Sequence, residues 1–339
     1  MTTTSSFRIA TFNLENLDWA RGHEIEFERR IAVLRPIMNE LAADVVCLQE
    51  IDAQRSTPRA ARQFLALDRL LCDTVYQKYE RVTSVRPGTH APADVHNLVI
   101  LSRWPICERR QVHHDIVAKW RWTPPSEDIS PSLPIEITWE RPLLYAKISM
   151  PAGAALHIVN LHLRALRPVP ISNNIDSRRM STLSTRAWAE GQFIAVQKQD
   201  GQALEARLFV ERLFDSEPNA LIAVCGDLNS EEHDAPARLL KGIPEEHAGE
   251  LLGRTLTPLI TRVEASRRFS VIHAGRPVLL DHILASRTLT ACCTNAKILN
   301  EGLKDEVLSE EPILASLHAP IIASFEFGNG SIGEKPGGS

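Results

Sequence analysis

The chain has 339 residues, of which 44% are hydrophobic and 24% charged, a balance typical of a globular protein with a substantial core. Its net charge of −4 disfavours a protein that holds long DNA mainly by neutralising phosphates, but nucleic acid stays open as a substrate. Residues 1–8 hold no apolar core of signal-peptide length, and no apolar run approaches about eighteen residues, so neither a signal peptide nor a membrane span is expected. No pair of the six cysteines has metal-ligand spacing, which predicts buried free thiols and a cytoplasmic location.

The first segments predict a strand, a helix and a second strand. Residues 8–13 fit a strand with Asn13 on its polar face. Between Glu24 and Ala42 apolar residues recur every three or four positions, as in an amphipathic helix, and Pro36 predicts a kink or a break within it. A short apolar strand follows and ends in Glu50, and residues 58–71 fit a second helix.

Strands dominate the rest of the chain. Two helices are expected at residues 184–196 and 202–214, separated by Gly201 and its polar neighbours. Because several strands follow one another without a helix between them, we expect mixed β-sheets packed face to face with helices outside, rather than one parallel sheet. The predicted strands lie at residues 81–84, 97–102, 143–148, 155–163, 221–225, 279–285 and 321–325.

A single domain is expected over residues 1–327. Two segments have the composition of insertions into it, near residues 113–141, which are rich in Pro and Trp, and near residues 164–200, which begin with an arginine-rich stretch. The tail at residues 328–339 is rich in Gly and Ser and is predicted to be disordered.

Polar side chains suited to metal or phosphate chemistry stand where the predicted strands end or begin. A single Glu there is usually a solvated strand end, and a single His is usually a satisfied structural residue. The recurrence of such residues along one chain is much harder to obtain by chance. They are Asn13, Glu50, Asn160, His162, Asp227, Asn229, Asp281 and His318.

These segments resemble the endonuclease/exonuclease/phosphatase superfamily, which includes DNases, abasic-site endonucleases, sphingomyelinases and inositol-polyphosphate phosphatases. The most specific matches are Leu-Gln-Glu at residues 48–50 and Gly-Asp-Leu-Asn at residues 226–229. The resemblance implies a four-layered α/β sandwich with its site at one edge of the sheets. The other matching segments are residues 11–17, 97–105, 159–163, 280–283 and 316–320.

The resemblance also implies hydrolysis of a phosphate ester with the help of a divalent cation, Mg²⁺ or Mn²⁺. Because Mg²⁺ prefers hard oxygen ligands, Glu50 is the first metal ligand, and Asn13 would support Glu50 or the metal. Asp227 would orient and deprotonate the attacking water. Asn229, two residues further along an extended segment, would point the same way and fix that water and a phosphate oxygen.

The histidines would act on the phosphate itself. His162 would contact it and help the leaving oxygen, and Asn160, on the same face of its strand, is a candidate for substrate binding. His318 would stabilise the charge that develops on the phosphoryl oxygens, with Asp281 accepting its other N–H.

Arginines supply further candidates. The stretch at residues 164–186 is either a solvated face or an arm that grips substrate, because a guanidinium binds phosphate through two N–H groups. Arg164, Arg178 and Arg179 are its candidate substrate-binding residues. Arg141 stands at a strand start and could bind phosphate or cap the sheet edge. His113-His114-Asp115 is a weaker candidate for metal binding.

One position departs from the family. Its last motif usually reads Ser-Asp-His, and here it reads Ser316-Leu317-His318, so the carboxylate before the histidine is missing. The leading expectation is a metal-dependent phosphodiesterase, an endo- or exonuclease acting on DNA or RNA. A phosphatase or phosphodiesterase for a small or lipid-derived phosphate is nearly as well supported. A scaffold that has lost catalysis is the third alternative, which only Leu317 favours.

Overall fold

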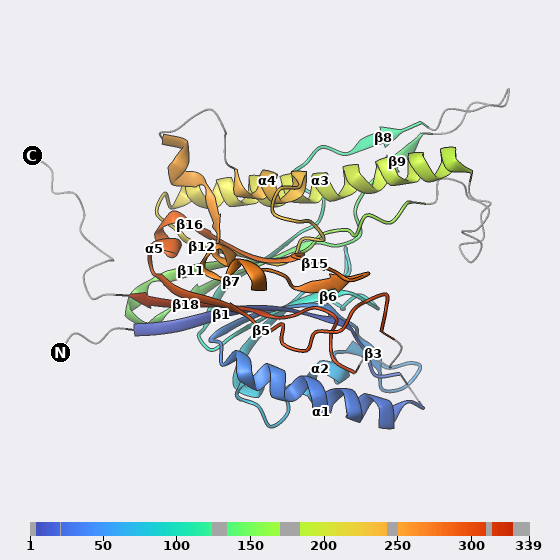
Figure 1. Ribbon diagram of the computed structural model, residues 1–339, viewed down its shortest axis with the longest axis horizontal. Coiled ribbons are helices and arrows are strands. Elements are labelled where there is room, and N and C mark those ends of the chain that lie inside the picture. Colours follow the sequence, from blue (N-terminus) through green and yellow to red (C-terminus); the bar gives the residue numbers. More distant parts are fainter. Residues whose placement is uncertain are drawn as a thin grey trace, which may run out of the picture.

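The computed structural model describes residues 5–20, 22–123, 134–169, 184–242, 250–309 and 314–327 (Figure 1). Arg178, Arg179 and the predicted tail at residues 328–339 therefore lie outside the described residues. Within these ranges no helix combines the length and the apolar composition required to cross a membrane.

Two six-stranded mixed sheets lie face to face (Figure 1). The first has the order β17-β18-β1-β2-β6-β5, and the second has the order β13-β16-β12-β11-β10-β7. The strands of the first are β1 (Ser5–Leu17), β2 (Val45–Ile51), β5 (Glu80–Thr83), β6 (Asn97–Ser102), β17 (Cys293–Ile298) and β18 (Ile321–Phe327). Those of the second are β7 (Ile106–Val112), β10 (Leu143–Ser149), β11 (Ala155–His162), β12 (Leu221–Asp227), β13 (Leu256–Pro258) and β16 (Asp281–Ser286).

Helices cover the outer face of each sheet, which makes the four layers that the sequence predicts (Figure 1). Helices α1 (Glu24–Leu41) and α2 (Leu65–Leu71) pack on the first sheet, and α3 (Thr185–Ser216) and α4 (Ala235–Lys241) pack on the second. A third apolar layer fills the space between the sheets and includes Ile9, Ile100 and Ile158.

Shorter elements connect this framework. They comprise α5 (Arg287–Ala291), the two-stranded ribbons β3–β4 (Gln54–Arg55, Arg62–Gln63), β8–β9 (Trp120–Trp122, Ile135–Ile137) and β14–β15 (Val271–His273, Arg276–Val278), and 3₁₀ turns at Val75–Lys78, Pro151–Gly153, Glu250–Arg254, Leu259–Arg262 and Ala265–Arg267.

Three predictions about helices are wrong. Helix α1 continues unbroken through Pro36, which is exposed, so water can reach the carbonyl that lacks its usual N–H partner. Residues 58–71 form part of a β-ribbon before the short α2 begins at Leu65. Gly201 does not interrupt α3, and its missing side chain allows close packing there: a Cβ would lie 2.7 Å from the ring of Trp139.

The six cysteines are free, as predicted, but their burial varies. Cys47, Cys225 and Cys293 are buried, whereas Cys107 is exposed, so the expectation that all the thiols are buried is wrong for Cys107.

Candidate active site

Each sheet contains one parallel pair of strands, and these pairs place the predicted residues together. β1 is parallel to β2, and β11 is parallel to β12. Because the carboxyl ends of parallel strands meet at one edge, Glu50 emerges near Asn13, and His162 lies opposite Asp227 in register. Asp281 begins β16 as the antiparallel partner of Asp227, so three strands of the second sheet converge on one point.

Gly226 makes this convergence possible. Its φ of +139° is a conformation that residues with a side chain rarely adopt. A Cβ at this position would lie 1.9 Å from the carbonyl oxygen of Leu161 on the neighbouring strand. The glycine of the Gly-Asp-Leu-Asn segment is therefore required for β12 to approach β11 directly before Asp227.

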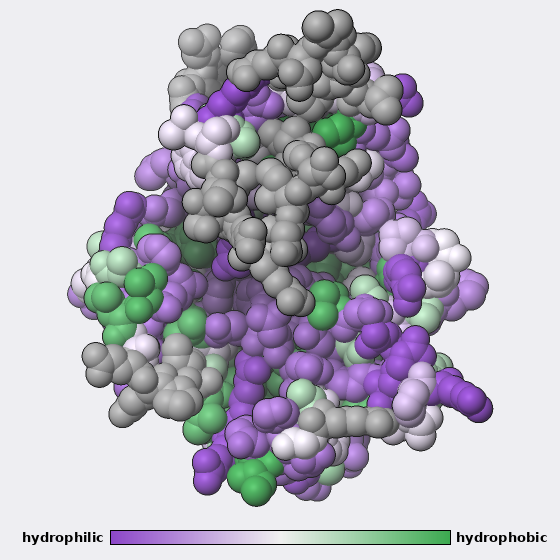
Figure 2. All heavy atoms as spheres, turned by 90° about the vertical axis from the view of Figure 1, so that its right-hand side faces the viewer, coloured by the Kyte–Doolittle hydropathy of each residue, from purple (hydrophilic) through white to green (hydrophobic). Residues whose placement is uncertain are grey.

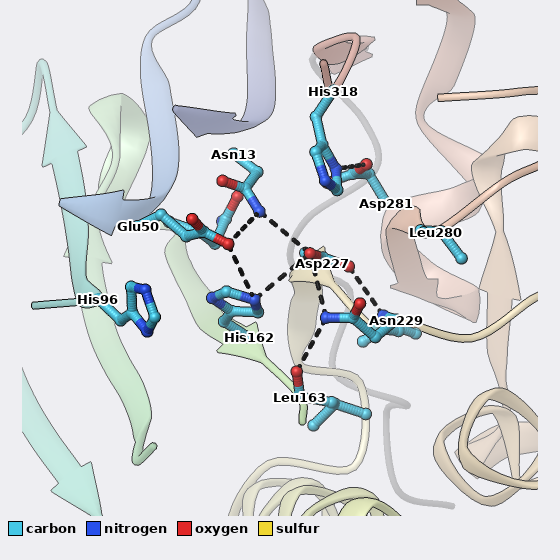
Figure 3. Close-up of polar contacts among 12 residues, drawn as sticks. Asn13, Glu50, His96, His162, Leu163, Asp227, Asn229, Leu280, Asp281 and His318 are labelled. Carbon is cyan, nitrogen blue, oxygen red and sulfur yellow. Dashed lines mark hydrogen bonds and ion pairs between the residues drawn. The ribbon is translucent and has the colours of Figure 1, made fainter. Parts of the chain in front are cut away.

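Four side chains form a connected cluster at the centre of the site (Figure 3). The Nδ2 of Asn13 donates to Glu50 Oε1 at 3.2 Å and to Asp227 Oδ2 at 3.0 Å. The Nε2 of His162 lies 3.5 Å from Glu50 Oε1 and 3.4 Å from Asp227 Oδ2. One amide and one imidazole thus hold two carboxylates that come from different sheets.

Asn229 fixes Asp227 from the following turn. Its backbone N–H donates to Asp227 Oδ1 at 2.8 Å, and its Nδ2 lies 3.2 Å from Oδ2. The same Nδ2 donates to the carbonyl of Leu163 at 3.0 Å, and a φ of +47° curls the turn toward the carboxylate. The structure therefore brings Asn229 to Asp227, as the spacing of the two residues predicts.

His318 and Asp281 form a buried pair, with Nδ1 2.7 Å from Oδ2 (Figure 3). Burial alone would lower the pKa of His318, but the negative charges of Asp281, Asp227 and Glu50 outweigh it and raise this pKa to about 10. The imidazole is therefore a cation at neutral pH. The hydroxyl of Ser316 bridges this segment to the first sheet, because it accepts from the N–H of His318 at 3.0 Å and donates to the carbonyl of Asn13 at 2.7 Å.

In Asp227 and His162, burial is the largest effect on the pKa and favours the neutral form of each side chain. Burial and the nearby charge of Asp281 raise the pKa of Asp227 to about 7, against the opposing effects of His318 and of the Asn229 N–H. Burial, reinforced by Arg141, holds the pKa of His162 well below its usual value, so this imidazole is neutral. The two histidines therefore differ in charge: one is a cation beside the carboxylates, and the other is a neutral donor or acceptor.

The cluster fits a divalent cation. Two overlapping sets of side chains have ligand atoms within 4.8 Å of one another: Glu50, His162 and Asp227, and Asp227, Asp281 and His318. Their carboxylates outnumber the single cationic imidazole, and the buried atoms His162 Nδ1 and Asp281 Oδ1 have no hydrogen-bond partner. Oxygen-rich sites that carry excess negative charge suit Mg²⁺ or Mn²⁺.

An open pocket of about 410 Å³ lies over this cluster. Figure 2 looks onto this edge of the sheets and shows a hollowed, mainly hydrophilic surface at its centre. The lining of the pocket includes a group of carboxylates, Glu15, Glu50 and Asp227, which we call the carboxylate wall, and a group of arginines, Arg141, Arg164 and Arg167, which we call the arginine wall. Glu140, which pairs with Arg164 at 3.3 Å, also lines the pocket. The pocket thus offers both a site for a cation and a site for an anion.

Arg141 is the most enclosed residue of the arginine wall. Its guanidinium donates to the carbonyl of Leu163 at 3.1 Å and lies 3.2 Å from Nδ1 of His96. Helix α3 holds this wall in place through Gln202, which donates to the carbonyl of Arg141 at 3.2 Å and accepts from the N–H of Arg164 at 2.9 Å. The sequence leaves two roles open for Arg141, binding of phosphate or capping of the sheet edge. In the structure its side chain lines the pocket.

Two predicted candidates belong neither to the cluster nor to the lining of the pocket. Asn160 is fully buried between the sheets, donates to the carbonyls of Leu48 and Val99 at 3.0 Å each, and accepts from Gln49 at 2.7 Å. All its polar atoms are therefore occupied by protein, and it ties β11 to β2 without reaching the pocket.

His114 stacks on Trp139, with ring centroids 3.6 Å apart. Glu205 anchors the surrounding segment by accepting from the backbone N–H groups of residues 114–116 and from Trp139 Nε1. Neither potential metal-binding group among the described residues includes residues 113–115, and the ring of His114 packs on Trp139.

Sequence reasoning missed three kinds of residue in the site. His96 lines the pocket, and its position directly before a matching strand was the available signal. Glu15 also lines it and accepts from the backbone N–H of Leu317 at 2.7 Å, so a carboxylate lies beside the position where the family usually has Asp. Gln199 and Gln202 of α3 support the loops, and nothing in a solvated helical pattern distinguishes them.

A sandwich of two mixed sheets, with carboxylates and histidines gathered at the carboxyl ends of its parallel strands, defines the DNase I-like fold class. The Endonuclease/Exonuclease/phosphatase family model matches residues 10–302, so the chain belongs to this family, whose members are divalent-metal-dependent hydrolases of phosphoester bonds. No curated protein matches the chain in sequence.

Solved structures share the fold at low sequence identity. An endonuclease/exonuclease/phosphatase family protein from Bacteroides thetaiotaomicron has a TM-score of 0.58 and 13% identity, covering 97% of this chain and 98% of its own. Truncated TDP2 from Caenorhabditis elegans has a TM-score of 0.54 and 15% identity, with coverage of 94% and 97%. The 3' phosphatase NExo from Neisseria, bound to a product DNA hairpin, has a TM-score of 0.51 and 14% identity, with coverage of 95% and 100%.

Proposed function

We propose that this protein is a divalent-metal-dependent phosphodiesterase that acts on nucleic acid. The observation that carries the proposal is the pocket with two walls of opposite charge, because a phosphodiester needs a cation at its reacting oxygens and donors for its negative charge. The DNA-bound state of the similar Neisseria 3' phosphatase supports nucleic acid as the substrate class.

The cation would be held on the carboxylate wall. Glu50 offers the most accessible carboxylate, and Asn13 orients it through the 3.2 Å hydrogen bond. When bound, Mg²⁺ or Mn²⁺ supplies positive charge that stabilises the phosphoryl oxygens and the leaving oxygen. Position 317 carries Leu instead of the Asp usual in the family, but the carboxylate of Glu15 lies beside that position and supplies negative charge.

Asp227 is the group we assign to the attacking water. Its Oδ1 accepts from the Asn229 N–H, and its Oδ2 accepts from Asn13, so the carboxylate has a fixed orientation in which to receive a proton. Asn229 would hold the same water and one phosphate oxygen. The hydrogen bond from its Nδ2 to Leu163 fixes the amide in place.

The histidines would act on the phosphate group. His318, a cation paired with Asp281, donates from its free Nε2 toward negative charge that grows on the phosphoryl oxygens. Neutral His162 lies between Glu50 and Asp227 and would interact with the leaving oxygen. On the arginine wall, Arg164 and Arg141 would hold the flanking phosphates of a strand.

One observation favours a second candidate, a phosphodiesterase for a lipid-derived substrate. Four aliphatic residues lie within two positions of pocket residues in the sequence and are 45% to 64% exposed. Exposed aliphatic side chains near the pocket could pack against the acyl chains of a lipid, whereas only the bases of a nucleic acid could make such contacts. The four residues are Val95, Leu166, Val307 and Leu308.

A hydrolysis panel tests the proposal. Single- and double-stranded DNA, abasic DNA, RNA, a generic aryl phosphodiester, inositol phosphates and sphingomyelin vesicles are each incubated with Mg²⁺, Mn²⁺ or Ca²⁺. We expect cleavage of a nucleic acid that stops in excess chelator and returns with added cation. Cleavage of vesicles alone would select the second candidate, and full activity in chelator would contradict both.

A further inference from the structure

We propose that Arg30, a residue of α1 outside the pocket, is the positioning residue of the metal site. It holds the turn at residues 14–16, and this turn gives Asn13 and Glu50 their orientation. The inference rests on the proposed function only for its catalytic readout, because its effects on metal binding and on the backbone are independent of any substrate.

The turn is an unusual piece of backbone. Glu15 and Asn16 have φ values of +48° and +51°, a left-handed conformation that costs free energy in residues with a Cβ. Two such residues in succession, within strand β1, leave their carbonyl groups pointing out of the sheet ladder. The pairing of β1 with β2 shifts register between Asn13 and Leu17, over the same residues.

Arg30 donates hydrogen bonds to three backbone carbonyl oxygens of residues 14–16. Its Nη2 donates to the oxygens of Leu14 and Glu15 at 2.6 Å each, and its Nη1 donates to that of Asn16 at 3.1 Å. A planar guanidinium can satisfy three acceptors from one rigid fork, whereas a lysine ammonium offers no such geometry. The register of β1 with β2 pairs Asn13 and then Leu17 and gives the residues between them no partner, and these bonds help to offset the cost of the left-handed turn.

This turn also orients two residues of the site. The N–H of Asn16 donates to Glu50 Oε2 at 3.0 Å, and the N–H of Glu15 donates to Asn13 Oδ1 at 2.9 Å. The second bond decides which way the Asn13 amide faces, and so directs its Nδ2 at Glu50 and Asp227. If the turn relaxed to ordinary strand geometry, both N–H groups would move away from these oxygens.

The same turn reaches two more parts of the pocket. The side-chain oxygen of Asn16 lies 2.8 Å from Nε2 of His96, and the carboxylate of Glu15 accepts from the N–H of Leu317. Arg30 itself does not line the pocket, so it holds these groups through the backbone, and its charge also interacts with those of Glu15 and Glu50.

Arg35 provides a matched control. It also lies on α1, is also partly buried, and also donates to backbone carbonyls, those of Arg69 and Leu70 on α2. These contacts lie away from the turn. Arg35→Met therefore removes a comparable set of hydrogen bonds from the same helix without touching the site.

The experiment compares the full chain with Arg30→Met, Arg30→Lys and Arg35→Met. Titration calorimetry with Mn²⁺ measures metal affinity, hydrogen exchange followed by mass spectrometry measures protection of residues 11–19, and steady-state kinetics on the best substrate of the panel separates kcat from KM. We expect both Arg30 variants to bind Mn²⁺ about tenfold to a hundredfold more weakly and to lose kcat by a similar factor, with little change in KM. Residues 11–19 should exchange faster, whereas Arg35→Met should match the wild type in all three.

Free guanidinium sharpens the test. Millimolar guanidinium should restore part of the Mn²⁺ affinity of Arg30→Met, and ammonium should not. Equal Mn²⁺ affinity and equal exchange in Arg30→Met and Arg35→Met would overturn the role of Arg30. A wild type that binds Mn²⁺ but cleaves nothing would overturn the proposed function instead, and the affinity and exchange comparisons would still decide the role of Arg30.

Discussion

The two walls of the pocket are built in different ways. On the carboxylate wall, Glu50 and Asp227 end central strands, and backbone N–H groups of neighbouring residues fix their oxygens. On the arginine wall, Arg141 and Arg164 lie in loops, and side chains of α3 hold them. The groups that we propose to react are therefore fixed by the sheet, and the groups that we propose to capture substrate depend on side-chain contacts and charge. Changes to the first wall should lower turnover, and changes to the second should lower affinity.

The sharpest test of this division is to remove charge from the carboxylate wall. Glu50→Gln and Asp227→Asn should each lower kcat on the order of a thousandfold, because each removes a charge that places the metal or the water. Single-turnover kinetics measures the effect, and the melting temperature should change little. Glu205→Gln is the control, since it neutralises a buried carboxylate that does not line the pocket and should reduce stability while leaving kcat near that of the wild type. Wild-type turnover in either site variant would contradict the assignment.

Asp281 should have the next largest effect. Asp281→Ala should lower kcat about a hundredfold by releasing His318 from its orientation. It should also lower the pKa of His318 from about 10, since the charge of Asp281 helps to raise it, so the cationic form should be lost at a lower pH. The alkaline limb of the pH–rate profile should shift to lower pH accordingly. A profile identical to that of the wild type would exclude Asp281 as the partner of His318.

The arginine wall should respond differently. The double variant Arg164→Gln, Arg167→Gln should raise KM for a nucleic acid about tenfold and flatten its salt dependence, while kcat on a small phosphodiester stays within about twofold. Arg103→Gln, an exposed arginine outside the pocket, should change neither value. If kcat on the small substrate collapses in the double variant, the two walls do not divide the work as proposed.

The smallest change is expected at Leu317. Leu317→Asp should tighten Mn²⁺ binding and alter turnover only a few-fold, because it adds a carboxylate beside that of Glu15 rather than replacing a missing function. Calorimetry of this variant against Leu317→Asn separates the effect of charge from that of polarity. Activity that appears only in Leu317→Asp would instead mark the natural chain as a catalytically inactive scaffold.

The walls also differ in how far sequence predicts them. Glu50, Asp227 and His318 follow apolar strands in motifs with fixed spacing, and strand ends converge by topology, so these residues could be named in advance. Gln199 and Gln202 had no such signal, because their role depends on where α3 lies. Asn160 was named from the sequence but does not reach the pocket. The alternation of side chains along β11 places it on the same face as His162, but alternation cannot reveal that β2 covers this part of the face.

Helix boundaries failed for similar reasons. Gly201 was predicted to separate two helices, yet its missing side chain lets α3 pack against Trp139. A local preference was overridden by a tertiary contact that no residue pattern reveals.

Two assignments stay predictions: that residues 1–327 form one domain with two insertions, and that the cation is Mg²⁺ or Mn²⁺.

Gly226 sets a limit on how this site can be redesigned. With a Cβ position 1.9 Å from the oxygen of Leu161, the floor beneath Asp227 cannot accept one added carbon without displacing a strand. Selection for a new substrate would therefore find its useful variation in the segments around Arg164 and His96, and almost none below them.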